Sequence, residues 1–274
     1  MLPVKAAVLG SPVAHSLSPV LHNAAYRALG LDHTYTAIET AESELGKFLE
    51  SIDTNWLGVS LTMPLKEVAF EFATSCDELA QSTGAINTLV FGAQVRAFNT
   101  DVLGIIDALV EADPAQVESA VIFGSGATAR SALVAVQKLG AKEVACVARN
   151  VNDIERMARV ANEIGVSFTP AQVSESGWLL ADVVVNTTPV GVLDEAAQEV
   201  SSPNGLLLDV VYNPWPTQLA ASWGVAGGTI VSGLSMLLHQ AAHQVTLMTG
   251  EPAPVAQMRE ALNAELLIRG LATI

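Results

Sequence analysis

Residues 121–129, Val121-Ile-Phe-Gly124-Ser-Gly126-Ala-Thr-Ala129, join an apolar strand-like run to a helical pattern through two glycines. This Gly-x-Gly-x-x-Ala spacing is typical of βαβ units that bind a dinucleotide. Gly124 allows the tight turn, Gly126 lets the backbone approach a pyrophosphate, and Ala129 lets helix and strand pack closely. The amide groups and dipole of the helix N-terminus favour a negative charge there. We therefore predict a dinucleotide site, in preference to an ordinary glycine turn.

The end of the next predicted strand bears on which dinucleotide binds. An acidic residue there would bind the ribose 2′-hydroxyl of NAD and repel a 2′-phosphate, but the sequence is Ala148-Arg149-Asn150. The guanidinium of Arg149, joined by that of Arg130, suits a 2′-phosphate. In the alternative, Arg149 is a solvated charge and Asp153 folds back to the ribose. The pattern favours NADP over NAD.

Strand-like and helical patterns alternate on both sides of this motif, which predicts an α/β fold with mostly parallel sheets in two domains. The motif belongs to a series with predicted strands at Ala120–Phe123, Val144–Ala148, Val183–Asn186 and Leu206–Val211 and helices at Ala129–Leu139 and Asn152–Ile164. An earlier series has predicted strands at Ala6–Leu9, Tyr35–Ile38, Val59–Leu61 and Ile86–Phe91 and helices at Pro19–Leu29, Glu42–Ile52 and Leu65–Cys76.

A helix predicted over Leu103–Ala112 lies between the two series and ends at Asp113-Pro114, because proline disfavours helical geometry in the residue before it. We place the domain junction at this helix. Residues 1–103 are expected to form a substrate-binding and catalytic α/β domain, and residues 104–233 a Rossmann domain that binds NADP. Two last helices, at Leu234–Met248 and Val255–Leu267, no longer alternate with strands and are expected to complete the first domain over residues 234–274.

The composition limits the possible partners. A net charge of -15 makes long-range attraction to nucleic acid or to an anionic membrane improbable. The two cysteines, Cys76 and Cys146, fall in a predicted helix and a predicted buried strand, which favours a reducing compartment. We find neither a leader pattern nor an apolar run of membrane-spanning length. We therefore expect a cytoplasmic protein, monomeric or homodimeric, that acts on a small molecule.

Polar residues gather where the first predicted strand ends, in Gly10-Ser-Pro12-Val-Ala-His15-Ser16-Leu-Ser18-Pro19. Ser18 stands at a natural capping position and Pro19 in the first helical turn. The hydroxyls of Ser16 and Ser18, together with free amide groups, are suited to holding a carboxylate. Simple helix capping explains the same residues equally well.

Further polar residues follow other predicted strands, at the sheet edge where open α/β folds bind ligands. Thr62 and Lys66 occur in Gly58-Val-Ser-Leu-Thr62-Met-Pro64-Leu-Lys66, Asn87 in Gly84-Ala-Ile-Asn87-Thr88, and Asp101 in Asn99-Thr100-Asp101. Taken alone, Lys66 is an exposed lysine at a helix start and Asp101 is the cap of the helix from Leu103.

These segments closely resemble the shikimate dehydrogenase family, and the resemblance continues through Asp209-Val-Val-Tyr212-Asn-Pro214 and Gly233-Leu-Ser-Met236-Leu-Leu-His-Gln240. It implies reversible, NADPH-dependent reduction of 3-dehydroshikimate to shikimate, on the route to chorismate and the aromatic amino acids. On the substrate side it implies carboxylate binding by Ser16 and Ser18, contacts to ring hydroxyls from Thr62, Lys66, Asn87, Asp101 and Gln240, and closure of the pocket by Tyr212. On the cofactor side it implies pyrophosphate binding by Gly124, Ser125, Gly126, Ala127 and Thr128, 2′-phosphate binding by Arg149, and Val210, Gly233 and Met236 near the nicotinamide.

Carbonyl reduction needs a proton for the developing alkoxide, and we expect Lys66 to supply it as general acid while Asp101 accepts from a ring hydroxyl and orients the pair. His239 and His243 have the spacing of zinc-protease ligands, but Gln240 stands where that motif needs Glu, so we expect no metal. Two alternatives stay open. One is a quinate/shikimate dehydrogenase that uses NAD, and the other is a regulatory module that senses NADP without catalysis.

Overall fold

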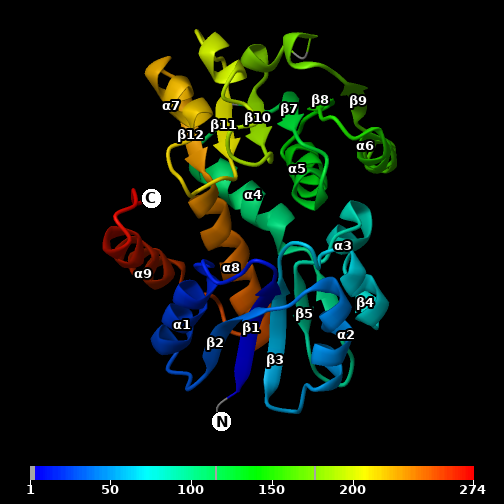
Figure 1. Cartoon of the computed structure of the whole chain (residues 1–274), viewed down its shortest axis with the longest axis vertical. Coiled ribbons are helices and arrows are strands. Elements are labelled where there is room, and N and C mark those ends of the chain that lie inside the picture. The colour runs from blue at the N-terminus through cyan, green and yellow to red at the C-terminus, as the bar shows by residue number, and fades with distance from the viewer. Residues whose placement is uncertain (1–3, 115, 176) are drawn as a thin grey trace. The chain divides into compact units, whose positions relative to one another are not determined.

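The computed structural model describes residues 4–114, 116–175 and 177–274, and these divide into two compact units. The first unit comprises the chain up to Thr100 together with Leu237–Ile274, and the second comprises Asp101–Met236. Within the described residues, each unit is built on a six-stranded sheet (Figure 1). The predicted α/β fold with mostly parallel strands is confirmed.

The sheet of the first unit has the order β2-β1-β3-β5-β6-β4. Its strands are β1 (Lys5–Gly10), β2 (Thr34–Glu39), β3 (Trp56–Leu61), β4 (Ser75–Cys76), β5 (Thr88–Val90) and β6 (Arg96–Phe98). Strand β1 pairs in parallel with β2 and β3, whereas β5 runs antiparallel to both β3 and β6. The carboxyl ends of β1 and β3 therefore lie beside the start of β5, which brings segments distant in sequence to one edge.

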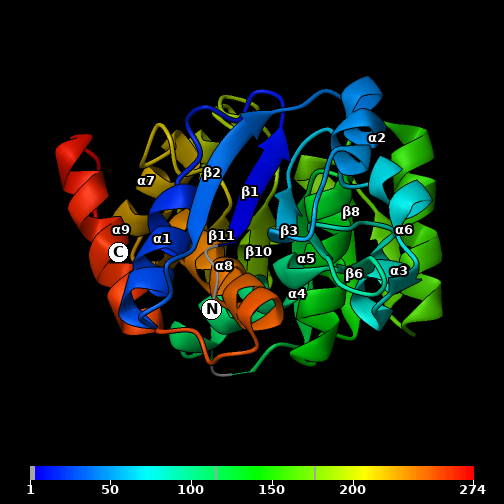
Figure 2. The same ribbon diagram turned by 90° about the horizontal axis from the view of Figure 1, so that it is seen from below.

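Alternating residues of β1 face two separate helical layers, as the period of a strand requires. Ala6 and Val8 pack toward α1 (Ser18–Ala28) and α8 (Gly233–Thr249), in a cluster that includes Tyr26 and Met248. Ala7 and Leu9 pack on the opposite face toward α2 (Glu42–Glu50) and α3 (Glu78–Thr83). Helix α9 (Val255–Ile268) packs against α1 (Figure 2). The two terminal helices thus cover the first unit.

The helix predicted over Leu65–Cys76 is wrong. The segment forms a turn, a short 3-10 helix at Val68–Phe72 and then strand β4, which pairs in parallel with β6. The amide groups of Thr74 and Ser75 both donate to the carbonyl oxygen of Val95, at 2.8 and 3.3 Å. This long-range pairing overrides the local helical period, because it provides hydrogen bonds that a continued helix would have made within itself.

The second unit is a fully parallel sheet with the order β12-β11-β10-β7-β8-β9. Its strands are β7 (Ser119–Phe123), β8 (Glu143–Val147), β9 (Ser167–Pro170), β10 (Val183–Asn186), β11 (Leu206–Asp209) and β12 (Thr229–Ser232), and its helices are α4 (Thr100–Glu111), α5 (Ala127–Lys138), α6 (Val151–Glu163) and α7 (Gln218–Val225). Short 3-10 helices occur at Val173–Glu175, Trp178–Leu180 and Ala196–Glu199. The strand order reverses between β7 and β10, and the carboxyl ends of strands at such a switch point are where doubly wound folds bind ligands.

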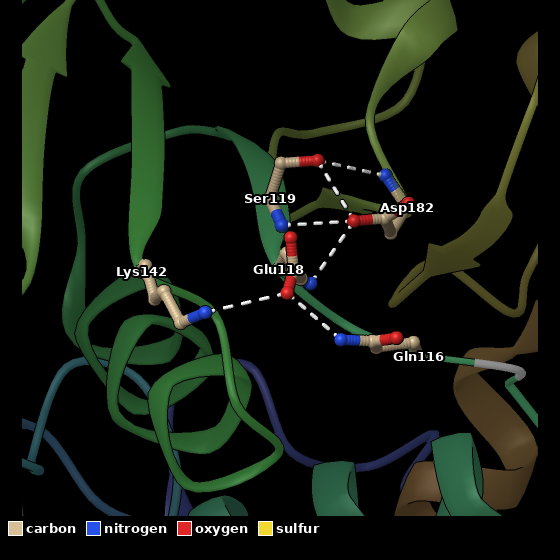
Figure 3. A network of polar contacts seen from close by, with 5 residues as sticks. All are labelled: Gln116, Glu118, Ser119, Lys142 and Asp182. Carbon is tan, nitrogen blue, oxygen red and sulfur yellow. Dashed lines mark hydrogen bonds and ion pairs between the residues drawn. The ribbon is translucent and has the colours of Figure 1, made fainter.

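At the opposite, amino-terminal edge of this sheet, Asp182 joins β7 to β10 (Figure 3). Its carboxylate accepts hydrogen bonds from the amide groups of Glu118 and Ser119 and from the Ser119 hydroxyl, at 2.9 to 3.0 Å. Desolvation opposes ionisation of Asp182, but these hydrogen bonds together outweigh it and lower its pKa. Lys142 pairs with Glu118 at 3.3 Å on the exposed side. These contacts fix the amino-terminal end of the sheet.

Candidate active site

The glycine turn after β7 has two glycines with different physical roles. Gly124 has a φ of +102°, and a Cβ there would overlap the hydroxyl of Thr187. Gly126 is the N-cap of α5 in extended geometry, and a Cβ there would meet no heavy atom within 4 Å. Gly124 is therefore required by the fold itself, whereas the space in front of Gly126 is open to a ligand.

A cavity of about 950 Å³ lies in front of this turn. It is lined by the ends of four strands: Gly124 to Gly126 follow β7, Val147 to Asn150 end β8 and continue it, Ala171 to Ser174 follow β9, and Thr187 to Pro189 follow β10. Arg149 lines it, as expected of a cation that meets a 2′-phosphate. Of the two side chains weighed with Arg149, Arg130 is buried and Asp153 lies 3.7 Å from Arg156, and neither belongs to the lining.

The loop after β10 was not singled out in the sequence, although it shapes the cavity. Thr187 donates its amide and hydroxyl hydrogens to the carbonyl oxygen of Phe123, at 2.9 and 2.7 Å, and so holds the loop against the end of β7. The Oδ1 atom of Asn186 accepts from the amide and hydroxyl of Thr188, at 2.9 and 2.6 Å. The available signal was the run of polar residues that begins at Asn186, at the end of a valine-rich strand, because it obeys the same strand-end rule as the other candidates.

Asp209 fixes the end of β11. Its fully buried carboxylate accepts from Asn186 Nδ2 at 3.0 Å, the Val211 amide at 3.1 Å and the Thr217 hydroxyl at 2.6 Å. Desolvation raises its pKa, and the three hydrogen bonds limit that rise. The segment that carries Val210 and Tyr212 is therefore tied to β10 at its start and to α7 beyond its end.

The residues expected near the nicotinamide include two that touch each other. A Cβ at Gly233 would overlap the backbone of Val210, so the chain leaving β12 packs directly against the chain leaving β11. Met236 is buried one turn further along α8. Ala127 and Thr128 lie in the first turn of α5 and are not among the residues that line the cavity.

In the first unit, the chain after β1 and the chain after β3 are packed backbone to backbone. The amide of Thr62 donates to Leu9 O at 2.9 Å, and the amide of Ser11 donates to Met63 O at 3.0 Å. A Cβ at Gly10 would overlap Thr62, so only glycine permits this approach. The two predicted substrate segments are therefore brought together.

The predicted capping role of Ser18 is wrong. Helix α1 begins at Ser18 and its N-cap is Leu17, while the Ser16 hydroxyl accepts from the Ser18 amide at 3.2 Å. The loop before the helix is held by Glu39, whose carboxylate accepts from the Val13 amide at 3.0 Å. Hydrogen bonds from the Ser11 side chain and from Val13 lower the pKa of Glu39. Glu39 was missed because it is an exposed acid at the end of β2 with no motif around it.

Asn87 and Gln240 meet, although 153 positions separate them in the sequence. Asn87 Nδ2 lies 2.9 Å from Thr100 Oγ1 and 3.5 Å from Gln240 Oε1, and its Oδ1 accepts from the Thr100 amide at 2.8 Å. All three side chains are buried. The C-terminal helix α8 therefore supplies a residue to the same edge of the sheet as the segment before β5.

Lys66 and Asp101 are placed by their neighbours in the chain. The carbonyl oxygen of Lys66 accepts from the Ile86 amide at 2.8 Å, which ties it to the segment that carries Asn87. Asp101 follows Thr100 in the first turn of α4, so its predicted role as the cap of a helix from Leu103 is wrong. Because Lys66 belongs to the first unit and Asp101 begins the second, their pairing stays a prediction.

Comparison with known proteins identifies the family. Residues 8–89 match the sequence profile described as "Shikimate dehydrogenase substrate binding domain", and residues 233–262 match "Shikimate 5'-dehydrogenase C-terminal domain". The chain is 36% identical over 271 residues to "Shikimate dehydrogenase (NADP(+))" of Methanopyrus kandleri, covering 93% of each sequence. The chain belongs to the shikimate dehydrogenase family.

Solved structures of shikimate dehydrogenases share this fold. The enzyme of Mycobacterium tuberculosis is 43% identical with a TM-score of 0.88, over 94% of this chain and all of that one. The enzyme of Thermus thermophilus, crystallised with NADP(H) and shikimate, is 32% identical with a TM-score of 0.84, over 95% and 99% of the two chains. In the described part of this family member, none of the helices combines the length and apolar character needed to cross a bilayer.

Proposed function

We propose that this chain is an NADP-dependent shikimate dehydrogenase, which interconverts 3-dehydroshikimate and shikimate on the route to chorismate and the aromatic amino acids. One observation carries the proposal: 36% identity to an enzyme of that name extends over 93% of the chain. With a net charge of -15, the chain acts on small molecules rather than on nucleic acid, as a monomer or homodimer.

The cavity of the second unit fits NADP. Open space in front of Gly126 admits a pyrophosphate to the N-terminus of α5, where Gly124 to Thr128 offer amide groups and the helix dipole favours negative charge. Arg149, in the cavity lining, binds the 2′-phosphate through its planar guanidinium. Val210, Gly233 and Met236 flank the nicotinamide. Bound there, NADP supplies or accepts the hydride.

The first unit holds the substrate. Ser16 and Ser18 bind the carboxylate with hydroxyl and amide groups that the Glu39 contact keeps in place. Thr62, Asn87 and Gln240 bind the ring hydroxyls, and Tyr212 closes the pocket toward the carboxylate. The backbone contacts between the Gly10 and Thr62 segments support a preformed site, since the two segments fix each other through hydrogen bonds within the protein.

Lys66 carries the proton. Its ammonium hydrogen-bonds the reacting oxygen, stabilises the negative charge that develops during reduction and donates the proton, and it takes the proton back during shikimate oxidation. Asp101 accepts a hydrogen bond from a ring hydroxyl and orients the pair of reacting oxygen and lysine.

The test measures NADPH formation from shikimate and NADP⁺. Lys66→Ala should lower kcat about a hundredfold or more with a smaller change in KM, the size expected for a general acid-base group. Lys47→Ala, which removes an exposed lysine of α2, is the matched control and should behave like the wild type. A wild-type kcat for Lys66→Ala would exclude the role of this lysine.

The same assay separates the alternatives. Turnover of quinate with NAD⁺ at a kcat/KM equal to that of shikimate with NADP⁺ would identify a quinate/shikimate dehydrogenase. Binding of NADP⁺ without turnover of either substrate would identify a regulatory sensor.

A further inference from the structure

A continuous chain of buried hydrogen bonds crosses the first unit and ends at Asn87. The hydroxyl of Tyr35 in β2 donates to Ser60 Oγ in β3, and Ser60 donates to Gln244 Oε1 in α8 at 2.8 Å. Gln244 Nε2 donates to Thr88 Oγ1 at 3.0 Å and to Asn87 O at 3.3 Å, and Thr88 Oγ1 donates to Asn87 Oδ1 at 2.8 Å. All five side chains are buried. Three β-strands, β2, β3 and β5, and helix α8 therefore converge on one amide.

Each hydroxyl has a single hydrogen, and this gives the chain a direction. Because Tyr35 donates to Ser60, the Ser60 hydrogen is available for Gln244, and this holds the Gln244 oxygen toward β3 and its NH₂ group toward β5. The NH₂ group occupies an acceptor site on Thr88, whose own hydrogen then points to Asn87 Oδ1. The orientation of the Gln244 amide thus decides which way the Thr88 hydroxyl points.

The result is a single orientation of the Asn87 amide. Its oxygen accepts from both the Thr88 hydroxyl and the Thr100 amide, and its NH₂ group faces Thr100 Oγ1 and Gln240 Oε1. A flipped amide would set its NH₂ hydrogens against two buried donors. Asn87 therefore presents a hydrogen-bond donor, not an acceptor, on the side where Gln240 lies.

We propose that Gln244 is a positioning residue for substrate recognition, acting through Thr88 on Asn87 and, beside it, Gln240. The proposal rests on the proposed function, in which Asn87 and Gln240 bind the ring hydroxyls. Within the described residues, the side chain of Gln244 bonds only to the backbone and side chains of the first unit, so its effect falls on the substrate and not on the dinucleotide cavity of the second unit.

Two isosteric variants interrupt this series of hydrogen bonds, one at Gln244 and one at Thr88. Gln244→Met and Thr88→Val keep the buried volume and remove the directing hydrogen bonds, and each should raise KM for shikimate about tenfold. The values of kcat and of KM for NADP⁺ should stay within about twofold of the wild type. Thr88→Ser keeps the hydroxyl and should restore KM to within about twofold. The double variant Gln244→Met/Thr88→Val should also raise KM for shikimate only about tenfold, because both changes act through the same contact.

Tyr26→Phe is the matched control, because it removes a buried hydroxyl of the same unit. The Tyr26 hydroxyl is not a member of this series of hydrogen bonds and has no hydrogen-bond partner in the described residues. The kinetic constants of Tyr26→Phe should equal those of the wild type. The proposal is overturned if Gln244→Met keeps a wild-type KM for shikimate. It is also overturned if both isosteric variants lower kcat and raise KM for shikimate and KM for NADP⁺ together. A hundredfold higher KM for shikimate in the double variant would overturn it as well.

Side-chain amide NMR resonances of Asn87 separate this proposal from the proposed function. They should shift in Gln244→Met and Thr88→Val and not in Tyr26→Phe, whatever reaction the protein catalyses. Shifted resonances in a protein that does not oxidise shikimate would overturn the proposed function alone, and unshifted resonances would overturn the positioning role alone.

Discussion

The substitution Gly126→Ala, which adds a methyl group to the glycine turn, tests ligand binding by this turn separately from its contribution to folding. A Cβ at this position would meet no heavy atom within 4 Å, and the backbone has a φ of -77°, which alanine adopts freely. Replacing glycine by alanine restricts the unfolded chain and stabilises by about 0.4 to 1 kcal/mol, whereas alanine is a poorer N-cap than glycine by about 0.5 kcal/mol. The free energy of unfolding of Gly126→Ala should therefore change by less than about 0.5 kcal/mol.

The same methyl group should weaken NADP⁺ binding strongly. It projects from the N-terminus of α5 into the space through which a pyrophosphate would reach the helix amide groups. Hydrogen bonds to a charged group contribute about 1.5 to 3 kcal/mol each. Loss of one such contact corresponds to a Kd for NADP⁺ about ten to a hundred times higher.

Two other glycines provide the controls. Gly92→Ala, in the β5-β6 hairpin of the first unit, has the same open space around its Cβ and should leave NADP⁺ affinity unchanged, with a gain in stability of at most about 1 kcal/mol. Gly124→Ala should lose at least about 2 kcal/mol of stability, because φ is +102° and the methyl would overlap Thr187.

Isothermal titration with NADP⁺ gives the affinities, and thermal unfolding gives the stabilities. A wild-type Kd in a stable Gly126→Ala variant would refute the assignment of this turn to the pyrophosphate. A Gly124→Ala variant as stable as the wild type would refute the steric account of the turn.

Three further predictions test other parts of the structure. Arg149→Gln should raise KM for NADP⁺ about ten- to a hundredfold and leave KM for NAD⁺ unchanged; equal changes for both cofactors in steady-state kinetics would disprove the contact with the 2′-phosphate. Burial lowers the pKa of His22 from 6.5 to about 4, so the unfolded chain binds the proton more readily than the folded protein. About 3 kcal/mol of stability that is present above pH 6.5 should therefore be lost as the pH falls toward 4. Denaturant unfolding of His22→Gln across this range should show a shallower decline than the wild type, and parallel curves would contradict the account. Tyr35→Phe should lower the free energy of unfolding by about 1 kcal/mol in the same measurement, because Ser60 loses its donor. Tyr26→Phe should leave the free energy of unfolding unchanged, since the buried Tyr26 hydroxyl has no partner among the described residues. Equal losses in the two variants would show that the Tyr35 contact does not add stability.

Local pattern was sufficient for the central strands and the glycine turn of the second unit. Parallel strands buried on both faces are continuous apolar runs, and the glycine turn and Arg149 follow them directly, so composition, spacing and position all predict the same strand-turn-helix unit. The start of α5 was displaced by only two residues, from Ala129 to Ala127. Strands β9 and β12 were missed, because each has only four residues and is partly exposed at a sheet edge.

Local pattern failed where a long-range contact decides the conformation. The segment 65–76 has a helical period, but its last residues pair with the β5-β6 hairpin at Val95 and Arg96. No residue within the segment indicates that pairing. Ser18 and Asp101 have the chemistry of helix caps, yet α1 and α4 begin at or before them because the preceding residues already adopt helical geometry.

By itself, the sequence determined the fold class, the place of the dinucleotide turn and the residue types available at each strand end, since these depend on neighbours within a few positions along the chain. Only the tertiary structure decided that Gln240 and Gln244 of α8 stand beside Asn87 and Thr88, more than 150 positions away. The physical reason is that hydrogen bonds between buried side chains depend on distance and direction in space, and the chain brings these residues together only after its last helices pack on the first sheet.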